Sequence, residues 1–335
     1  MYYITGATGF LGLHIVKMLL EKGEKLRVLV YPGDPAEKQL PSGVEIIHGD
    51  VSDKESVKKF LEPKSLEKNT VIHCAGLISI AWKYDKRLWN INVLGTKNIT
   101  DICVERNYRL IYVSSVHAMQ EKPGNEPMEE VSAFSPSLVV GAYAKTKAAA
   151  SAYVVDSVVN RGLNAAMVFP SGITGPGALA NNSVTHMIKQ CALDKLPAGT
   201  KGGYNFVDVR DVALGIVNLC YKPNLKGGFI LSGHYKTIAE FFDAIYLATD
   251  KKTKRIKYMV PRWLVSVFVV PIYKIIYAIK KETPIYTRYS IYTLGRNANY
   301  VNKKAQELLN FKPRVFNITV NDTVLWMKEN GLIKY

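Results

Sequence analysis

Short apolar runs alternate with longer amphipathic stretches along the first 230 residues of the chain. Apolar positions such as Leu11, Ile15, Met18 and Leu19 recur at helical spacing between those runs. Strands that alternate with helices predict an α/β fold with a doubly wound parallel sheet. Six runs have the length and residue types of buried strands: residues 2–4, 25–30, 44–48, 71–73, 110–113 and 164–169.

The pattern also predicts how the chain is divided. A larger domain is expected at residues 1–170, with its sheet and helices partly completed by residues 203–233. The remainder, residues 171–202 and 234–335, is expected to form a smaller and mostly helical lobe. The other predicted elements are helices at residues 88–106, 143–161 and 237–249, a strand end plus helix at 206–221, a strand at 229–231 and a surface loop at 121–137.

Three glycines directly follow the first predicted strand. Gly6 lets the chain turn tightly, Gly9 lets the backbone approach a pyrophosphate, and Gly12 lets the following helix pack against the sheet. The N-terminus of that helix then directs its N–H groups toward the anion. This GxxGxxG turn predicts a dinucleotide site, and a purely structural turn is the alternative.

Two further positions bear on the cofactor. Val30 and Tyr31 stand where an acidic residue normally favours NAD and an arginine favours NADP, and neither residue decides the preference. Asp50 is expected to bind the adenine amino group, with Val51 against the ring, whereas a turn-forming carboxylate is the alternative.

A tyrosine and a lysine provide the candidate chemistry. Tyr143 and Lys147 are four residues apart and share one face of a predicted helix. The ammonium of Lys147 is expected to favour the phenolate of Tyr143 and lower its pKa. Ser115, at the end of a neighbouring strand, can hydrogen-bond the same substrate oxygen. His117 is interpreted as a loop histidine with one backbone hydrogen bond, an extra acid or base being the alternative.

These motifs together resemble the extended short-chain dehydrogenase/reductase family, which includes the NAD-dependent epimerases and dehydratases and has a Rossmann fold. The matching motifs are the glycine turn, Asp50-Val51, Asn92-Val93-x-Gly95-Thr96, Ser115 and Tyr143-xxx-Lys147. Residues 170–177 and 206–212 are similar to the dihydroflavonol-reductase-like and 3β-hydroxysteroid-dehydrogenase-like branch.

The resemblance implies an NAD(P)-binding larger domain, a substrate-binding smaller lobe and hydride transfer to or from a ketone, aldehyde or secondary alcohol. Tyr143 would exchange a proton with the oxygen that Ser115 polarises, and Lys147 would hold the nicotinamide ribose. With these three catalytic residues, the expected cofactor-binding set is Gly6, Thr8, Gly9, Phe10, Leu11, Gly12, Tyr31, Asp50, Val51, Cys74, Ala75, Gly76, Asn92, Val113, Tyr143, Lys147, Pro170, Ser171, Gly172 and Ile173.

Two other functions remain open at this stage. A sugar-nucleotide epimerase would use the same triad, and a catalytically silent NAD(P)-sensing protein would keep the fold alone. A dehydratase is disfavoured, because Ser115-Val116-His117 stands where those enzymes carry Thr-Asp-Glu. The expected partner is a small-molecule substrate of apolar character. A homodimer is left open, and no metal is expected.

Composition indicates a cellular location and shows that charge is unevenly distributed along the chain. The four cysteines lack metal-ligand spacing, and the first strand begins at Tyr2, which together favour a cytoplasmic protein. The net charge of +16 is unevenly spread, because residues 251–335 hold 17 Lys and Arg against 4 Asp and Glu, a net +13. No nucleic-acid recognition motif accompanies that charge.

The basic region also contains an apolar run, within residues 255–300. Residues 263–279 are nearly all apolar, but Pro271 and Lys274 interrupt them, which disfavours a spanning helix. An apolar lid over the substrate cleft, with Trp263 and Phe268 mostly buried, is favoured over a helix pair at a membrane surface. The tyrosines nearby are expected to line the same cleft or to pack as core: Tyr286, Tyr289, Tyr292 and Tyr300.

Overall fold

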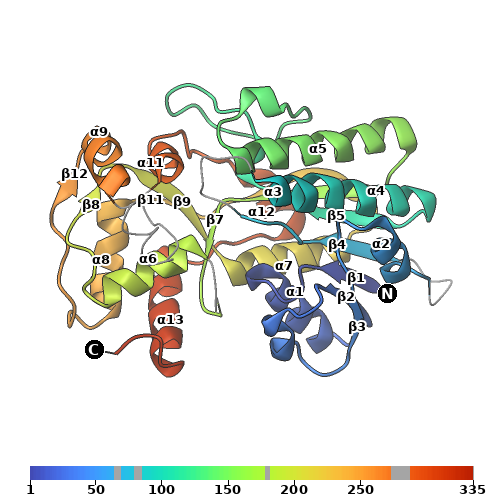
Figure 1. The fold of residues 1–335 in the computed structure, drawn as a ribbon, viewed down its shortest axis with the longest axis horizontal. Helices are drawn as coiled ribbons and strands as arrows, with labels where there is room; N and C mark the ends of the chain where they lie inside the picture. Colours follow the sequence, from blue (N-terminus) through green and yellow to red (C-terminus); the bar gives the residue numbers. More distant parts are fainter. Residues whose placement is uncertain (64–68, 79–84, 178–181, 273–286, 335) are drawn as a thin grey trace.

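A computed structural model describes residues 1–63, 69–78, 85–177, 182–272 and 287–334, and it contains one large parallel sheet beside a smaller lobe (Figure 1). The seven strands of the large sheet follow the order β10-β6-β5-β4-β1-β2-β3. All their pairings are parallel, so the prediction of a doubly wound sheet is confirmed. The strands are β1 (Tyr2–Thr5), β2 (Leu26–Val30), β3 (Val44–His48), β4 (Thr70–His73), β5 (Arg109–Val113), β6 (Ala165–Pro170) and β10 (Gly227–Leu231).

Helices cover both faces of this sheet, because its strands are apolar on both sides. Within β1, Tyr3 belongs to one hydrophobic core and Ile4 to the other, since successive side chains of a strand point to opposite faces. The helices on the Tyr3 side are α2 (Lys54–Phe60), α4 (Gly95–Glu105) and α5 (Ala142–Arg161). Those on the Ile4 side are α1 (Phe10–Glu21), α7 (Val209–Cys220) and α12 (Lys303–Leu309).

The smaller lobe has its own core and two small sheets. Strands β7 (Gly172–Thr174), β9 (Gly203–Asp208) and β11 (His234–Thr237) form one sheet in the order β11-β9-β7. Strands β8 (Gly199–Thr200) and β12 (Met259–Val260) form the second. The helices that enclose the core are α6 (Ser183–Ala192), α8 (Ile238–Ala248) and α13 (Phe316–Glu329).

The predicted boundaries differ from the structure in one respect. The division assigns all of residues 234–335 to the smaller lobe, but α12 packs against α7 and β10 of the large sheet. Its Ala305 and Leu309 are fully buried in the core on that face. The apolar positions of α12 are too few to reveal from sequence which sheet they cover.

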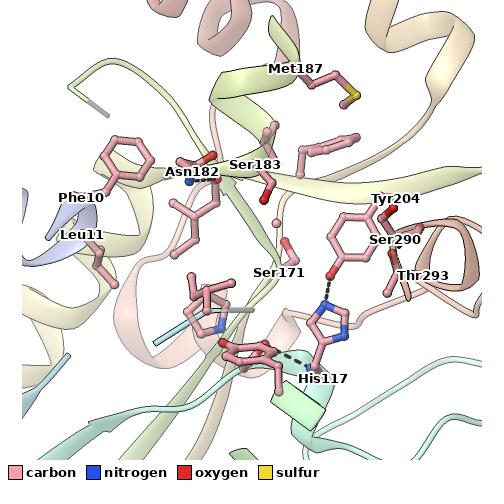
Figure 2. A pocket seen from close by; sticks show the side chains of 18 of the residues that line it. Phe10, Leu11, His117, Ser171, Asn182, Ser183, Met187, Tyr204, Ser290 and Thr293 are labelled. Carbon is pink, nitrogen blue, oxygen red and sulfur yellow. Dashed lines mark hydrogen bonds between the residues drawn. The ribbon is translucent and has the colours of Figure 1, made fainter. Parts of the chain in front are cut away.

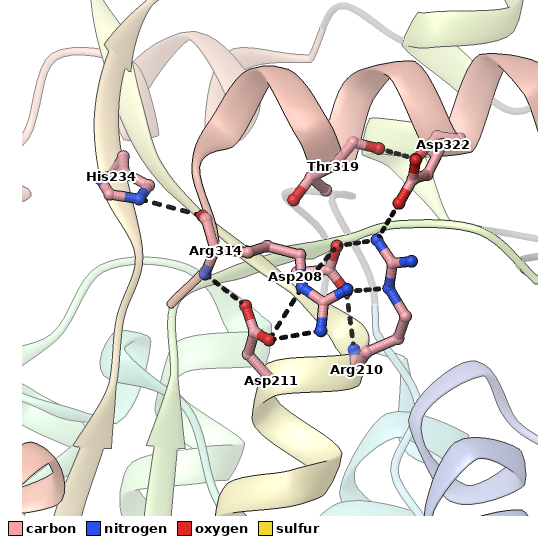
Figure 3. Close-up of polar contacts among 8 residues, drawn as sticks. Asp208, Arg210, Asp211, His234, Arg314, Thr319 and Asp322 are labelled. Carbon is pink, nitrogen blue, oxygen red and sulfur yellow. Dashed lines mark hydrogen bonds and ion pairs between the residues drawn. The ribbon is translucent and has the colours of Figure 1, made fainter. Parts of the chain in front are cut away.

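An ion-pair network joins the two lobes between β9, α7 and α13 (Figure 3). Asp208 caps α7 and accepts hydrogen bonds from the backbone and side chain of Arg210. Arg210 also pairs with Asp322 of α13 at 2.8 Å, and Asp211 binds the guanidinium of Arg314 at 2.7 Å. Burial alone would raise the pKa of Asp208, but Arg210 holds it below its ordinary value. The charged residues of segment 206–212, which are Asp208, Arg210 and Asp211, are therefore ion-pair partners in this network.

The apolar run near residue 263 begins a helix, with α9 (Arg262–Leu264) followed by a π-helical turn (Val265–Val269). The expectation that Trp263 and Phe268 are mostly buried is wrong, since they are 64% and 58% exposed. Val265 and Val270 occupy the inner face instead, where they pack against Ile291 of α11 (Arg288–Thr293). Residues 273–286 of the predicted lid, including Tyr286, lie outside the described residues.

Across the described part of the chain, no helix combines the length and apolar character that crossing a membrane requires.

The buried side chain of His73 links the ends of β1 and β4 to the start of α4 by two hydrogen bonds. Thr5 Oγ1 accepts from the Ala75 backbone, so it donates to His73 Nδ1 at 2.7 Å. Thr96 Oγ1 donates to a backbone carbonyl, so it accepts from His73 Nε2 at 3.0 Å. His73 is therefore fixed as a neutral ring, and burial lowers its pKa to about 3.

We expect His73 to make the fold acid-sensitive. The unfolded chain takes up a proton at this histidine below pH about 6.5 and the folded protein does not, so stability falls as the pH drops below that value. The slope is about 1.4 kcal/mol per pH unit for each such histidine. Urea unfolding of the wild type and His73→Gln from pH 7.5 to 5 should show a shallower loss in the variant. The control His48→Gln, at a surface pair with Glu37, should keep the wild-type slope; equal slopes in all three proteins would contradict the assignment.

Candidate active site

A cavity of about 450 Å³ lies at the carboxyl ends of β1, β4, β5 and β6, where it faces the smaller lobe. The large sheet contributes Gly6, Cys74 and Ser115 to its inner wall. The outer wall comes from α6, β9, α8 and α11 of the smaller lobe (Figure 2). Ligands of doubly wound sheets bind at this edge, so the cavity is the candidate active site.

The glycine turn is shaped by close contacts between backbones. Gly6 has a φ of +68°, and a Cβ there would lie 2.7 Å from the Ala75 nitrogen. A Cβ on Gly12 would lie 2.1 Å from the Gly6 carbonyl oxygen, so no larger residue fits. Gly9 is different, because a Cβ there would lie 3.1 Å from the Gly6 carbonyl oxygen, which leaves more room than at Gly6 or Gly12. Gly9 therefore opens space at the N-terminus of α1 and is not required to close the turn.

Asp34 is a carboxylate near this turn that sequence reasoning could not place. Its Oδ2 accepts a 2.7 Å hydrogen bond from Thr8 Oγ1, and its Oδ1 accepts from the Ala36 backbone. The position at the end of β2 is taken by Tyr31, whose side chain is 62% exposed. The acidic group beside the phosphate-binding turn is thus reached from the loop after β2.

The Asp50 carboxylate has a local role in the structure. Its Oδ1 accepts hydrogen bonds from the backbone and the hydroxyl of Ser52, which is the turn-forming arrangement. Val51 is buried against Gly95, where a Cβ would lie 2.8 Å from its Cγ2. Neither Asp50 nor Val51 lines the cavity, and their contact with an adenine ring stays a prediction.

Tyr143, Lys147 and Ser115 are brought together on the inner wall of the cavity. Burial raises the pKa of Tyr143 to about 12, and a hydrogen bond with Ser115 opposes that shift. The expectation that Lys147 lowers this pKa is not met, because Lys147 Nζ donates to the Val113 carbonyl at 2.8 Å and lies over the ring of Tyr112. Burial lowers the pKa of Lys147 itself to about 8.

Asn92 holds the segment after β4 in place beside Lys147. It lies in a wide π-helical turn (Asn90–Leu94), and its amide both accepts from the Leu77 nitrogen and donates to the Leu77 carbonyl. The same amide donates to Thr146 Oγ1 of α5. Asn92 therefore supports the wall and does not line it, a role that residue type alone could not distinguish from cofactor contact.

His117 is bound by side chains, so its interpretation as a loop histidine with one backbone bond is wrong. Arg296 Nη1 lies 3.1 Å from His117 Nδ1, and a guanidinium only donates, so Nδ1 accepts. Nε2 then carries the hydrogen and donates to Tyr204 Oη at 2.6 Å (Figure 2). Burial and the neighbouring Arg296 lower the pKa of His117 to about 3, which keeps the ring neutral. The hydroxyl hydrogen of Tyr204 is thereby directed away from His117.

Sequence reasoning missed most of the outer wall. Tyr289 lines the cavity, whereas Tyr292 binds Glu121 and Tyr300 packs in the core of the large sheet. The other wall residues carry no motif, because each is an ordinary apolar or small polar residue of a helix or strand. They include Asn182, Ser183, Val184, Met187, Tyr204, Phe206, Ile238, Phe242, Ile291, Thr293 and Leu294.

The structure divides the predicted site residues into two groups. Those that line the cavity are Gly6, Gly9, Phe10, Leu11, Gly12, Cys74, Gly76, Val113, Ser115, Tyr143, Lys147, Pro170, Ser171, Gly172 and Ile173. Those that lie outside its lining are Thr8, Tyr31, Asp50, Val51, Ala75 and Asn92.

The fold and this cavity define a Rossmann-type protein of the dinucleotide-binding class. A model of the NAD-dependent epimerase/dehydratase family matches residues 2–229, and the chain belongs to that family. Its members are NAD-dependent enzymes, and the resemblance noted from the motifs is confirmed.

Similar proteins extend over the whole chain. Sterol demethylase protein B of Methylococcus capsulatus is 26% identical over 98% of this chain and 99% of its own length. A putative dihydroflavonol 4-reductase of Synechocystis is 25% identical over 99% and 96%. The crystal structure of gox2253 has a TM-score of 0.84 at 26% identity, covering 100% of this chain and 99% of that one.

The residues present fit a nicotinamide dinucleotide. Gly9 gives the backbone opening that a pyrophosphate needs, and it is the N-cap of α1 with no side-chain cap. Among the described lining residues, none is Asp or Glu, and Lys147 supplies a buried cation. Ser171 Oγ is buried without a hydrogen-bond partner among the described residues, as a hydroxyl reserved for a ligand would be.

Gly9→Val should remove cofactor binding while the fold survives. Its branched side chain fills the opening at the turn, so we expect the affinity for NAD to fall by roughly 100-fold or more, as measured by calorimetry. Gly12→Ala is the matched control, because its Cβ would meet a backbone oxygen at 2.1 Å. That variant should lose about 3 kcal/mol or more of stability in urea unfolding. Wild-type NAD affinity in a folded Gly9→Val protein would contradict the phosphate site.

Proposed function

We propose that this protein is an NAD(P)-dependent oxidoreductase that interconverts a carbonyl group and an alcohol. The observation that carries the proposal is the convergence of Tyr143, Ser115 and the buried cation of Lys147 on one cavity wall. A phenol and a hydroxyl together can bind and protonate a carbonyl oxygen. The family membership and the reductase among the similar proteins support the same reaction class.

The walls favour a substrate with a large apolar part. Phe206, Ile238, Phe242, Ile291 and Leu294 face the cavity from the smaller lobe, and such side chains bind by burying apolar surface. A sugar nucleotide would place many hydroxyl groups against these walls and leave them without partners. The apolar wall therefore favours an oxidoreductase over an epimerase.

The chain's own residues would share the chemistry as follows. Tyr143, whose pKa is raised to about 12, holds its proton at neutral pH and can donate it to a carbonyl oxygen. Ser115 would donate a second hydrogen bond to that oxygen and fix its position. Lys147 would bind the ribose hydroxyls and place its positive charge beside the phenol. A bound nicotinamide supplies or takes up the hydride.

Tyr143→Phe should reduce turnover by roughly 1000-fold, because only the ionisable oxygen is removed. NAD(P) binding should stay within about threefold of wild type by calorimetry. Turnover is followed through the absorbance of the reduced nicotinamide with apolar ketones as substrates. Tyr292→Phe is the matched control, since its hydroxyl binds Glu121 outside the cavity, and it should keep its activity.

Two results would contradict this assignment. A Tyr143→Phe protein with the wild-type rate would exclude the phenol from the reaction. Cofactor that stays bound and is never consumed, while sugar nucleotides change configuration, would identify an epimerase instead.

We further propose that NAD is preferred to NADP. The carboxylate of Asp34 lies at the glycine turn, bound to Thr8 at 2.7 Å, where its charge would repel the 2′-phosphate of NADP. Asp34→Asn should shift the ratio of kcat/KM values about tenfold toward NADP by removing that repulsion. Glu37→Gln, a nearby acidic residue paired with His48, should leave the ratio unchanged. A wild-type enzyme that prefers NADP would exclude this role.

A further inference from the structure

The segment of residues 251–272 combines exposed apolar side chains with a high density of basic residues, and it does not line the cavity of the candidate active site. Figure 1 shows α9, in the middle of this segment, at the outer edge of the smaller lobe beside β12 and α11. The apolar members are Tyr258, Trp263, Val267, Phe268 and Ile272, each more than half exposed. We call these five side chains, together with Lys251, Lys254 and Lys257, the basic apolar face.

The helix that carries this face has two distinct sides. Val265 and Val270 are buried against Ile291, so the inner side is fixed to α11. The π-helical turn at Val265–Val269 advances more slowly around the axis than an α-helix does. It thereby keeps Trp263, Val267 and Ile272 on the side turned away from α11. Exposed aromatic and aliphatic groups gathered in this way mark an interaction surface.

The charge of the basic apolar face indicates which kind of partner can bind it. Residues 251–262 contain six Lys and Arg and no Asp or Glu. Lys251, Lys254 and Lys257 are exposed. Lys252 pairs with Asp250 at 3.9 Å and Arg255 with Asp243 at 2.8 Å, so the net charge of the face comes from the other three lysines. A surface that covers this face must therefore be anionic and must also accept apolar side chains.

We propose that the basic apolar face docks on the surface of an anionic lipid bilayer. Trp263, Phe268 and Ile272 would enter the boundary between head groups and acyl chains, and the lysines would contact anionic head groups. A second copy of this chain is a poorer occupant, because a two-fold contact would bring two basic surfaces together. A nucleic acid offers no apolar surface to cover the aliphatic side chains.

The position of the face also connects it with the cavity. The helix packs on α11, and Tyr289, Ser290 and Leu294 at and beside that helix line the cavity. An apolar substrate dissolved in the bilayer would then reach the enzyme near its outer wall. This last step rests on the proposed function, whereas docking on the bilayer does not depend on it.

The test is co-sedimentation of the full chain with vesicles of phosphatidylcholine alone or with one third phosphatidylglycerol. We expect roughly tenfold greater retention on the anionic vesicles at low salt, and a several-fold loss at high salt. The double variant Trp263→Ser, Phe268→Ser should reduce retention about tenfold. Lys251→Glu, Lys254→Glu, Lys257→Glu in one protein should remove the dependence on anionic lipid.

Matched controls lie on the large domain. Val159→Ser removes an exposed apolar side chain of α5, and Lys54→Glu, Lys59→Glu, Lys86→Glu in one protein changes the same charge elsewhere. Both should bind vesicles like the wild type.

Three results of the vesicle experiment would overturn the proposal: equal retention on neutral and anionic vesicles, no retention on either, or an equal loss of retention in the variants and the controls. A dimer by light scattering that Trp263→Ser, Phe268→Ser dissociates, without vesicle binding, would assign the face to a second copy and overturn it as well. Ketone turnover in detergent-free buffer reports on the proposed function separately.

Discussion

The fold depends on a backbone contact that admits no side chain. Gly6, Gly12 and Ala75 meet so closely that a Cβ at either glycine would approach a backbone atom within 2.7 Å or less. This contact sets α1 against the ends of β1 and β4, and α1 in turn packs along α7. The N-terminus of α1 therefore opens at the same edge of the sheet as Ser115 and Lys147. A larger residue at Gly6 or Gly12 would move the N-terminus of α1 away from those two side chains.

The second constraint is electrostatic, because the cavity buries a cation and none of its described lining residues is an Asp or Glu that could neutralise it. Lys147 is 4% exposed, and its partners are the Val113 carbonyl and the ring of Tyr112. The buried histidines beside the site remain neutral, since burial lowers the pKa of both His73 and His117 to about 3. Lys147 is therefore the buried cation among the described lining residues, and Arg296 is a second buried cation outside the lining, against His117. Tyr143 on the same wall keeps its proton at neutral pH, because burial raises its pKa to about 12.

The sequence predicted the large sheet and many of the residues that line the cavity at its edge, because those features depend on local patterns. Strand periodicity, the glycine turn and the spacing of Tyr143 and Lys147 each report a contact within one or two elements. Trp263 and His117 were misjudged for the opposite reason. His117 is bound by Arg296, and the helix that carries Trp263 packs on Ile291 through Val265 and Val270, which leaves Trp263 exposed. These contacts join residues that are distant in sequence, and an apolar run does not show which of its sides is covered. Asp34 was likewise out of reach, because its partner Thr8 is 26 residues away.

The two walls of the cavity lie on different lobes, so its width depends on how those lobes are held together. The buried Asp208 carboxylate at the end of β9 binds Arg210, which reaches Asp322 on α13. Asp211, one turn along α7, binds Arg314 just before α13. Because α7 packs on the large sheet and α13 on the smaller core, these pairs fix one wall of the cavity relative to the other. The charged network thereby helps to hold Tyr204 and Phe206 of the outer wall at a set distance from Tyr143 of the inner wall.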